Sequence, residues 1–227
     1  MCDNLNIPIE NWGRMSYVSA WNRQKEYVEL VRSMKENQTL SEERIIIVEH
    51  APVYTIGFHG NAGNMLASED YLKSVGAELI RIERGGDITY HGPGQLVVYP
   101  IIDIARRGIG VKSYVHILEH SVIELLKQYG IHASCNDSAI GVWLDWGEAS
   151  ERKICAIGVK VRHGVTMHGL ALNVNTDLNA FNLINPCGFV DKGVTSIARE
   201  LGKPVDFDSA SASLGKIISR RLKEATR

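Results

Sequence analysis

The segment 84–100 combines several glycines with side chains that could contact a ligand. Its sequence is RGGDITYHGPGQLVVYP, and Thr89, Tyr90 and His91 follow shortly after a glycine pair. A phosphate-binding loop needs GxxxxGK followed by Ser or Thr, and the chain contains no Gly-Lys-Ser or Gly-Lys-Thr. The dinucleotide pattern GxGxxG is also absent from this segment. We interpret the segment as a binding loop whose glycines let the backbone approach a ligand. The alternative is a tight connection between strands whose glycines only satisfy a positive φ.

The cysteines are the candidate nucleophiles and metal ligands of the chain. They stand at positions 2, 135, 155 and 187. They form no CxxC pair and no His/Cys knuckle, so their spacing predicts no metal site. A disulfide framework is unusual in a chain of this size without a signal peptide, and we expect reduced thiols. Most unpaired cysteines are small buried side chains, so spacing alone identifies no nucleophile.

The overall composition favours one folded domain. The chain has 227 residues, of which 44% are hydrophobic, enough for one sizeable core. Its net charge of −1 gives no electrostatic argument for a nucleic-acid partner, which normally meets a basic face. No apolar run approaches the roughly 20 residues of a membrane helix. The N-terminal sequence MCDNLNIPIENWG lacks the basic and apolar stretches of a secretion signal, so we expect a cytoplasmic protein without membrane contact.

Hydrophobic periodicity indicates the helices and strands that must position these residues. Apolar side chains at three- and four-residue steps predict helices over 16–36, 112–129 and 208–225. The last of these is expected to begin at Asp208 or Ser209. Strands are predicted over 44–50, 77–84, 94–104 and 138–146, with a hairpin over 153–175 that turns at His163 and Gly164. Pro100 favours an edge position or a bulge, and 51–64 is expected to be a loop.

The order of these elements predicts the fold class. Strands follow one another between helices instead of alternating strictly with them. This order favours an α+β fold over a doubly wound one, because parallel α/β sheets require a helix between successive strands. We therefore expect a single domain over residues 1–227, with a mixed or mostly antiparallel sheet flanked by helices.

Four blocks of the sequence together resemble the lipoyl(octanoyl) transferase family. They are, in chain order, EHAPVYTIG (49–57), the segment 84–99, KICAIGVKVRHGVTMHGLALNVNTDL (153–178) and INPCG (184–188). The resemblance covers roughly residues 45–190. It implies the fold shared by the catalytic domains of biotin and lipoate protein ligases.

The resemblance also implies a reaction and its participants. Members of this family transfer octanoyl from octanoyl-acyl carrier protein to a lysine of apo lipoyl domains or of the glycine-cleavage H protein. In this chain the family's nucleophile corresponds to Cys187, and the lysine that activates it corresponds to Lys153. The thiolate is the reactive form of a cysteine, so a lysine that takes the thiol proton suits this role. Neither ATP nor a metal is expected to take part.

The same resemblance implies a set of residues that bind the acyl substrate. They are Arg84, Gly85, Gly86, Asp87, Ile88, Thr89, Tyr90, His91, Ala156, Ile157, Gly158, Gly169, Leu170 and Ala171, with His168 in a supporting role. Small residues leave room for an apolar chain, and burying that chain contributes about 0.8 kcal/mol per methylene. For Arg84 there are three options: it contacts the phosphopantetheine arm, it contacts an acidic carrier surface, or it only anchors the loop. Cys155 departs from the small residue usual in the family, and we expect it to be packed in the core.

Three other functions remain open from the sequence. An ATP-dependent lipoate or biotin protein ligase has the same fold but needs no nucleophilic cysteine. A lipoyl-domain amidotransferase moves the acyl group between two lipoyl-domain proteins through a cysteine thioester. A non-enzymatic module that binds acyl carrier protein would leave the pair of Lys153 and Cys187 without a purpose.

Overall fold

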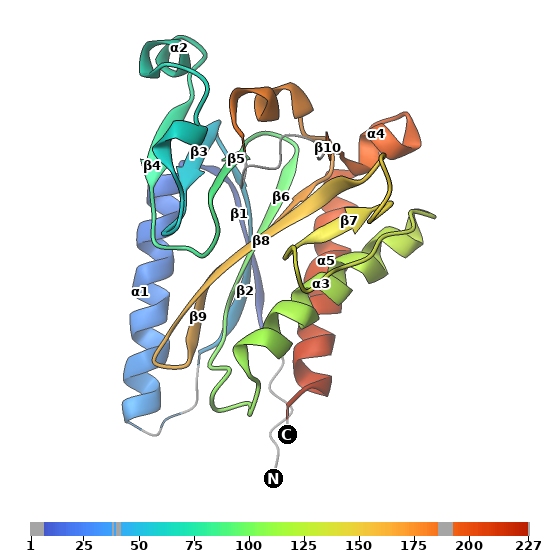
Figure 1. Cartoon of the computed structure of the whole chain (residues 1–227). Helices are drawn as coiled ribbons and strands as arrows, with labels where there is room; N and C mark the ends of the chain where they lie inside the picture. Colours follow the sequence, from blue (N-terminus) through green and yellow to red (C-terminus); the bar gives the residue numbers. More distant parts are fainter. Residues whose placement is uncertain (1–6, 38, 40–41, 186–192, 227) are drawn as a thin grey trace.

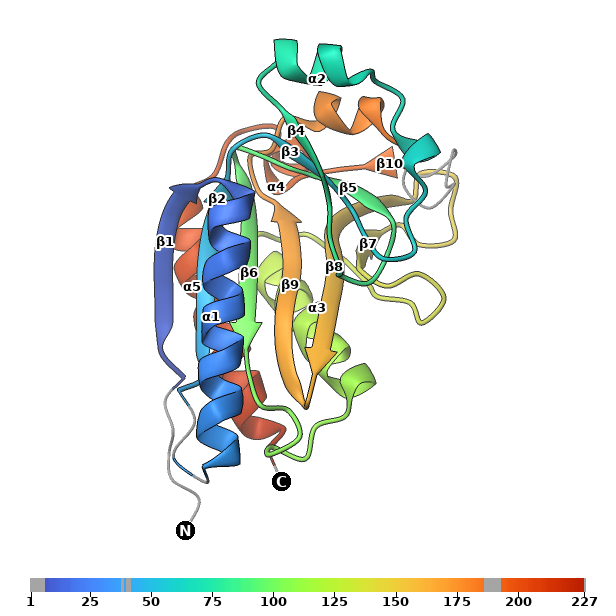
Figure 2. The ribbon, with the colours of Figure 1, turned by 90° about the vertical axis from the view of Figure 1, so that its left-hand side faces the viewer.

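The computed structural model describes residues 7–37, 39, 42–185 and 193–226. Within them, a large sheet has α1 on one face and α3 and α5 on the other, as Figures 1 and 2 show. A small second sheet packs at one end of the large one (Figure 1). This is the mixed α+β single domain expected from the order of the elements. None of the helices in the described ranges has the length and apolar character to cross a membrane.

The large sheet is mixed. Its strand order is β1 (Ile9–Met15), β2 (Arg44–His50), β6 (Gln95–Ile101), β9 (Val165–Asn173), β8 (Arg152–Arg162) and β10 (Gly193–Val194), and β7 (Val142–Leu144) also pairs with β8. The β1–β2 and β10–β8 pairs are parallel, and the other pairs are antiparallel. The predicted strand over 44–50 matches β2. Its continuous apolar run is explained by burial on both faces, since Ile45 packs on the α3 side and Ile46 on the α1 side.

Three long helices cover this sheet. They are α1 (Tyr17–Glu36), α3 (Val111–Gln128) and α5 (Phe207–Glu224), close to the predicted ranges. Ser16 caps α1 by accepting a hydrogen bond from the backbone N–H of Ser19. The start predicted for the last helix is wrong by a few residues. Its N-cap is Asp206, whose carboxylate accepts from the backbone N–H of Ser209.

The second sheet was not predicted as a sheet. It has the order β4 (Glu78–Arg81), β3 (Val53–Ile56) and β5 (Ile88–His91), and α2 (Glu69–Ser74) packs beside it. The expectation of a loop over 51–64 is therefore wrong for β3, and β5 makes four residues of the expected binding loop a strand. Four-residue strands are too short to show a clear period of two. Their partners come from separate parts of the chain, so the pairing is a tertiary property.

The remaining short elements are the helix α4 (Ile197–Leu201) and two 3-10 helices, η1 (Ala62–Asn64) and η2 (Leu178–Leu183). The strand predicted over 138–146 is reduced to the three residues of β7. The turn of the β8–β9 hairpin is confirmed, because His163 and Gly164 have φ of 52° and 83°. An edge position for Pro100 is wrong, because β6 lies between β2 and β9. The registered pairing of β6 with β9 runs only from Gln95 to Val98, however, and stops before this proline, which lacks a backbone N–H.

Candidate functional site

The glycine-rich turn at residues 85–87 is held against β8 by backbone contacts. The N–H of Gly85 donates to Val159 O at 3.2 Å, and the N–H of Gly57 donates to Asp87 O at 3.0 Å. A Cβ on Gly57 would lie 2.2 Å from Gly86 O, and one on Gly158 would lie 2.9 Å from Gly85 O. Three segments therefore meet backbone to backbone. Gly57 and Gly158 are required by the approach of the chain to itself.

The side chain of Arg84 anchors this turn. It is buried, with 8% of the residue exposed. The guanidinium donates to Thr55 O at 2.8 Å, to Thr55 Oγ1 at 2.9 Å and to Gly85 O at 3.0 Å. Of the three options left by the sequence, these contacts give direct support to the anchoring role. A contact between Arg84 and the substrate stays a prediction.

Asp87 connects the turn to the η1 loop. Its carboxylate accepts hydrogen bonds from the backbone N–H of Asn61 and from the side-chain amide of Asn64. The backbone O of Asn64 in turn accepts from the N–H of Asn185 at 2.8 Å. Asp87 thus helps to fix the place where the chain enters residues 186–192.

The strand β5 divides the remaining residues of the motif between two faces. Ile88 and Tyr90 belong to the small core of the second sheet, where Tyr90 contacts the rings of Tyr54 and Phe181. Successive side chains of a strand alternate between faces, so Thr89 and His91 face the other way. The motif therefore does not present all of its side chains to one place.

His91 belongs to a buried cluster of histidine and tyrosine rings. Its ring stacks on that of Tyr17 with centroids 5.6 Å apart, and His50 lies 5.9 Å away. Tyr99 contacts both His50 and His168. Sequence reasoning singled out His91 and His168 but missed Tyr17, His50 and Tyr99. The block 49–57 held the signal for His50.

Hydrogen bonds define the protonation of two of these rings. His50 Nδ1 contacts Met15 O at 3.1 Å, and a carbonyl only accepts, so Nδ1 carries the proton. His50 Nε2 then accepts from the hydroxyl of Tyr99 at 2.8 Å. His91 Nδ1 donates in the same way to Gln95 Oε1 at 2.7 Å. Burial lowers the pKa of His50 to about 4 and the pKa of His91 well below its usual value, so both rings are neutral at pH 7.

His168 is the most constrained residue of the cluster. It has φ of 62°, a left-handed conformation that is uncommon for a residue with a side chain. Its backbone N–H donates to Gln24 Oε1 on α1 at 2.9 Å. The residue is 1% exposed, and neither ring nitrogen has a hydrogen-bond partner within the described part of the chain. Burial lowers the pKa of His168 to about 3.

These buried rings predict that the protein loses stability in mild acid. A histidine that is neutral in the fold binds fewer protons than the same residue in the unfolded chain, whose pKa is about 6.5. The contribution of these histidines to the free energy of unfolding is therefore complete above pH 6.5. It should fall as the pH drops from 6.5 toward 4, by about 1.4 kcal/mol per pH unit for each such histidine.

Urea unfolding between pH 7.5 and 5.5 measures this slope before most carboxylates titrate. His168→Asn should reduce the slope, because asparagine tolerates a positive φ and does not titrate. The exposed His120 gives the matched control, and His120→Asn should keep the full slope. A wild-type protein whose stability is constant from pH 7.5 to 5.5 would contradict the prediction.

The small residues expected to line an acyl pocket face each other across β8 and β9. Ala156 pairs with Ala171, Ile157 with Leu170, and Gly158 with Gly169. The side chains do not share one face, however. Leu170 lies in the core beneath α3 and α5, and Ile157 packs against that core, whereas Ala171 packs on the α1 face.

Gly169 is required by packing inside the large sheet. A Cβ at this position would lie 2.2 Å from Val98 O on β6. Its small size therefore has a structural cause whether or not a ligand is bound. A role of this glycine in binding stays a prediction.

Lys153 stands near the start of β8, between β7 and β10. It pairs with Trp143 on one side and Val194 on the other. Its ammonium lies 4.4 Å from the centroid of the Trp143 ring, a cation–π contact. Gly158 is on the same strand, so at about 3.3 Å per residue the lysine lies about 16 Å along β8 from the glycine-rich turn.

Cys187 lies outside the described residues. The residues on both sides of its segment make β-strand contacts. Ile184 forms a β-bridge with Met65 beside the η1 loop. On the other side, Gly193 and Val194 pair with Arg152 and Lys153. The chain thus leaves residues 186–192 directly beside Lys153. Cys155 is fully buried in the core, as expected, and burial raises the pKa of its thiol.

Comparisons with known proteins agree on one family. The family model described as the lipoyl protein ligase A/B catalytic domain matches residues 16–218. An octanoyltransferase of Bacteroides fragilis is 52% identical over 93% of this chain and 96% of its own length. That of Bacteroides thetaiotaomicron is 50% identical over 97% of both chains, and that of Flavobacterium johnsoniae is 41% identical over 95% and 96%.

Solved structures agree on the fold. A bipartite lipoate protein ligase from Thermoplasma acidophilum superposes with a TM-score of 0.69, over 96% of this chain and 84% of that one, at 18% identity. Biotin protein ligase from Aquifex aeolicus gives a TM-score of 0.51 over 96% and 69%, at 14% identity. At these identities the likeness is one of fold alone.

Proposed function

Because the chain belongs to the lipoyl protein ligase A/B catalytic domain family, we propose that it transfers an octanoyl group to lipoyl domains. The observation that carries this function is its 41–52% identity to octanoyltransferases over nearly the whole chain. The ligases that share its fold are only 14–18% identical. The proposed donor is octanoyl-acyl carrier protein, and the proposed acceptors are apo lipoyl domains and the glycine-cleavage H protein.

The first proposed step forms an acyl-enzyme on Cys187. The amine of Lys153 takes the thiol proton, and the thiolate attacks the carbonyl carbon of the octanoyl thioester. A new carbon–sulfur bond forms, and the bond to the carrier's phosphopantetheine sulfur breaks. The leaving thiolate receives the proton held by Lys153. One thioester is exchanged for another, so the step is close to neutral in free energy.

The second proposed step passes the octanoyl group to the acceptor. The neutral amine of the acceptor lysine attacks the acyl carbonyl, an amide bond forms, and the sulfur of Cys187 leaves and is protonated. Formation of an amide from a thioester is downhill. Neither step requires a nucleotide or a metal.

The position of Lys153 supports its role as the partner of Cys187. The Trp143 ring contacts its ammonium, and β10 leads the chain directly from residues 186–192 to its side. Lys153 is half-buried at the point where the chain continues from the segment of Cys187, which suits a residue that exchanges a proton with that thiol.

An intact-mass experiment tests the proposed acyl-enzyme. We expect one octanoyl adduct when the protein is incubated with octanoyl-acyl carrier protein without ATP. The adduct should disappear on addition of an apo lipoyl domain and should not form in Cys187→Ala. Cys155→Ala is the matched control and should still be acylated, because the thiol of Cys155 is buried.

Three results would overturn the proposal. An adduct that survives in Cys187→Ala would place the acyl group on another residue. A strict requirement for ATP would favour a ligase that activates the free acid. Faster transfer from an octanoylated lipoyl-domain protein than from the carrier protein would instead indicate an amidotransferase.

A further inference from the structure

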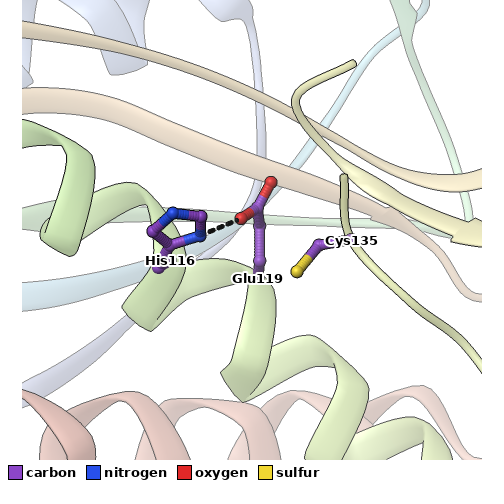
Figure 3. Close-up of side chains that lie close together, drawn as sticks. All are labelled: His116, Glu119 and Cys135. Carbon is purple, nitrogen blue, oxygen red and sulfur yellow. Dashed lines mark hydrogen bonds and ion pairs between the residues drawn. The ribbon is translucent and has the colours of Figure 1, made fainter. Parts of the chain in front are cut away.

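A group of potential metal ligands lies on the helical side of the sheet, away from the glycine-rich turn. His116 and Glu119 project from the same face of α3, three residues apart, and Cys135 comes from the segment after that helix. Figure 3 shows the three side chains converging, with the sulfur of Cys135 turned toward Glu119. One nitrogen, one oxygen and one sulfur atom lie within 4.8 Å of one another.

The remaining polar atoms of the two helical side chains already have other partners. His116 Nε2 lies 3.3 Å from Asp137 Oδ1, while Nδ1 lies 2.9 Å from Glu119 Oε2. Glu119 Oε1 accepts the backbone N–H of Gly141 at 3.1 Å. Metal-binding histidines usually donate their second N–H to a carboxylate, and metal-binding carboxylates are themselves hydrogen-bonded. The cluster has both of these features, and a bound ion would take the place of the contact between Nδ1 and Oε2, both within reach of Cys135 Sγ.

The burial of these side chains also suits a metal site that has one position open to solvent. Glu119 is 2% exposed, an unusual place for a carboxylate, and it pairs there with His116. The side chain of His116 is 36% exposed. The group is therefore anchored in the protein interior and opens toward solvent at the histidine, where an ion and a water molecule can enter.

We propose that His116 Nδ1, Glu119 and Cys135 Sγ bind a divalent cation of the zinc class, with water in a fourth position. Nitrogen, oxygen and thiolate donors together suit Zn²⁺, whereas Mg²⁺ and Ca²⁺ prefer oxygen alone. The thiol of Cys135 releases its proton to solvent when the ion binds. Cysteine spacing gave no signal for this site, because two of its ligands are a histidine and a glutamate on one helix.

Such an ion would join α3 to the segment that carries Gly141. That segment backs the proposed catalytic lysine, since a Cβ on Gly141 would lie 3.4 Å from Lys153 Cε. The ion would thus hold in place the segment that contacts Lys153, without taking part in acyl transfer. Its role is structural, and its binding can be measured independently of the proposed function.

Cobalt is the probe for this site, because Co²⁺ replaces Zn²⁺ and reports its ligands in the absorption spectrum. Untagged full-length protein, first treated with chelator, is titrated with Co²⁺. We expect one equivalent to bind with visible bands of a tetrahedral ion and a near-ultraviolet thiolate-to-cobalt band. Zn²⁺ should bleach both and raise the melting temperature.

Variants separate this site from the other thiols and histidines. Cys135→Ser should lose the thiolate band, although three other cysteines remain. His116→Asn should weaken binding by at least about tenfold. His120→Asn is the matched control on the same helix and should bind like the wild type. Circular dichroism verifies that each variant is folded.

Three results would overturn the inference. They are the absence of a tetrahedral cobalt spectrum at micromolar Co²⁺, an unchanged spectrum in Cys135→Ser, and equal loss of binding in His116→Asn and His120→Asn. Because His116 is partly exposed, His116→Asn is expected to fold, which keeps the test valid.

Discussion

Lys153→Ala should slow the acylation of Cys187 by about 10²–10⁴-fold, the range that a positioned general base contributes. Without the lysine amine, most of the thiol stays protonated at neutral pH, and the leaving sulfur has no nearby proton donor. Pre-steady-state mass spectrometry with octanoyl-acyl carrier protein measures the rate. The rate in the variant should recover as the pH rises toward the thiol pKa of about 8.5, because the thiolate then forms without help.

Lys153→Arg separates proton transfer from simple charge stabilisation. Arginine keeps a positive charge and can stack on Trp143, but its guanidinium does not give up a proton in proteins. If the lysine acts as a base, the arginine variant should be nearly as slow as the alanine variant. A rate close to wild type in Lys153→Arg would show that only the charge matters. A rate close to wild type in Lys153→Ala would make the lysine a bystander.

Gly57→Ala should strongly destabilise the fold beside the candidate site. The added Cβ would lie 2.2 Å from Gly86 O, and a backbone atom cannot move aside as a flexible side chain can. The turn at 85–87 must then leave β8, or the strand β3 must shift. We expect a loss of about 3 kcal/mol or more in the free energy of unfolding, measured by urea denaturation.

Gly110→Ala is the matched control for this change. Gly110 has a φ of −74°, and a Cβ there would meet no atom within 4 Å. The free energy of unfolding of Gly110→Ala should fall by less than about 1 kcal/mol, since the change affects only the N-cap of α3. Gly57→Ala should also reduce acyl-enzyme formation at temperatures where it remains folded, because the turn is displaced. Equal stabilities of Gly57→Ala and wild type would disprove the close approach of the three segments.

The elements predicted well from the sequence have strong local signals. The helices α1 and α3 carry apolar side chains at helical spacing over at least 18 residues. The β8–β9 turn needs two successive residues with positive φ, and His163-Gly164 is a local signature of such a turn. The strand β2 is a continuous apolar run because both of its faces are buried. In each case the pattern lies within one short stretch of chain.

The elements predicted poorly depend on partners that are distant in the sequence. The strands β3 and β5 have four residues each, and their sheet is completed by β4, which pairs with β3, and by η2, which packs on β5. The proline in β6 suggested an edge strand, yet the strand is central. The proline is tolerated there because the pairing with β9 stops before it. Local propensity carries no information about such pairings.

By itself, the sequence determined the family, the α+β fold and the residues proposed for catalysis, because these are written in ordered blocks and local periodicity. Only the tertiary structure decided what several of those residues contact. It directs Arg84 to Thr55, gathers His50, His91 and His168 in one buried cluster, and separates Leu170 from Ala171 onto opposite faces. It also brings Cys135 to His116 and Glu119. The physical reason is that burial, proton affinity and metal binding depend on which atoms lie close together in space. The separation of two residues along the chain does not determine whether they do.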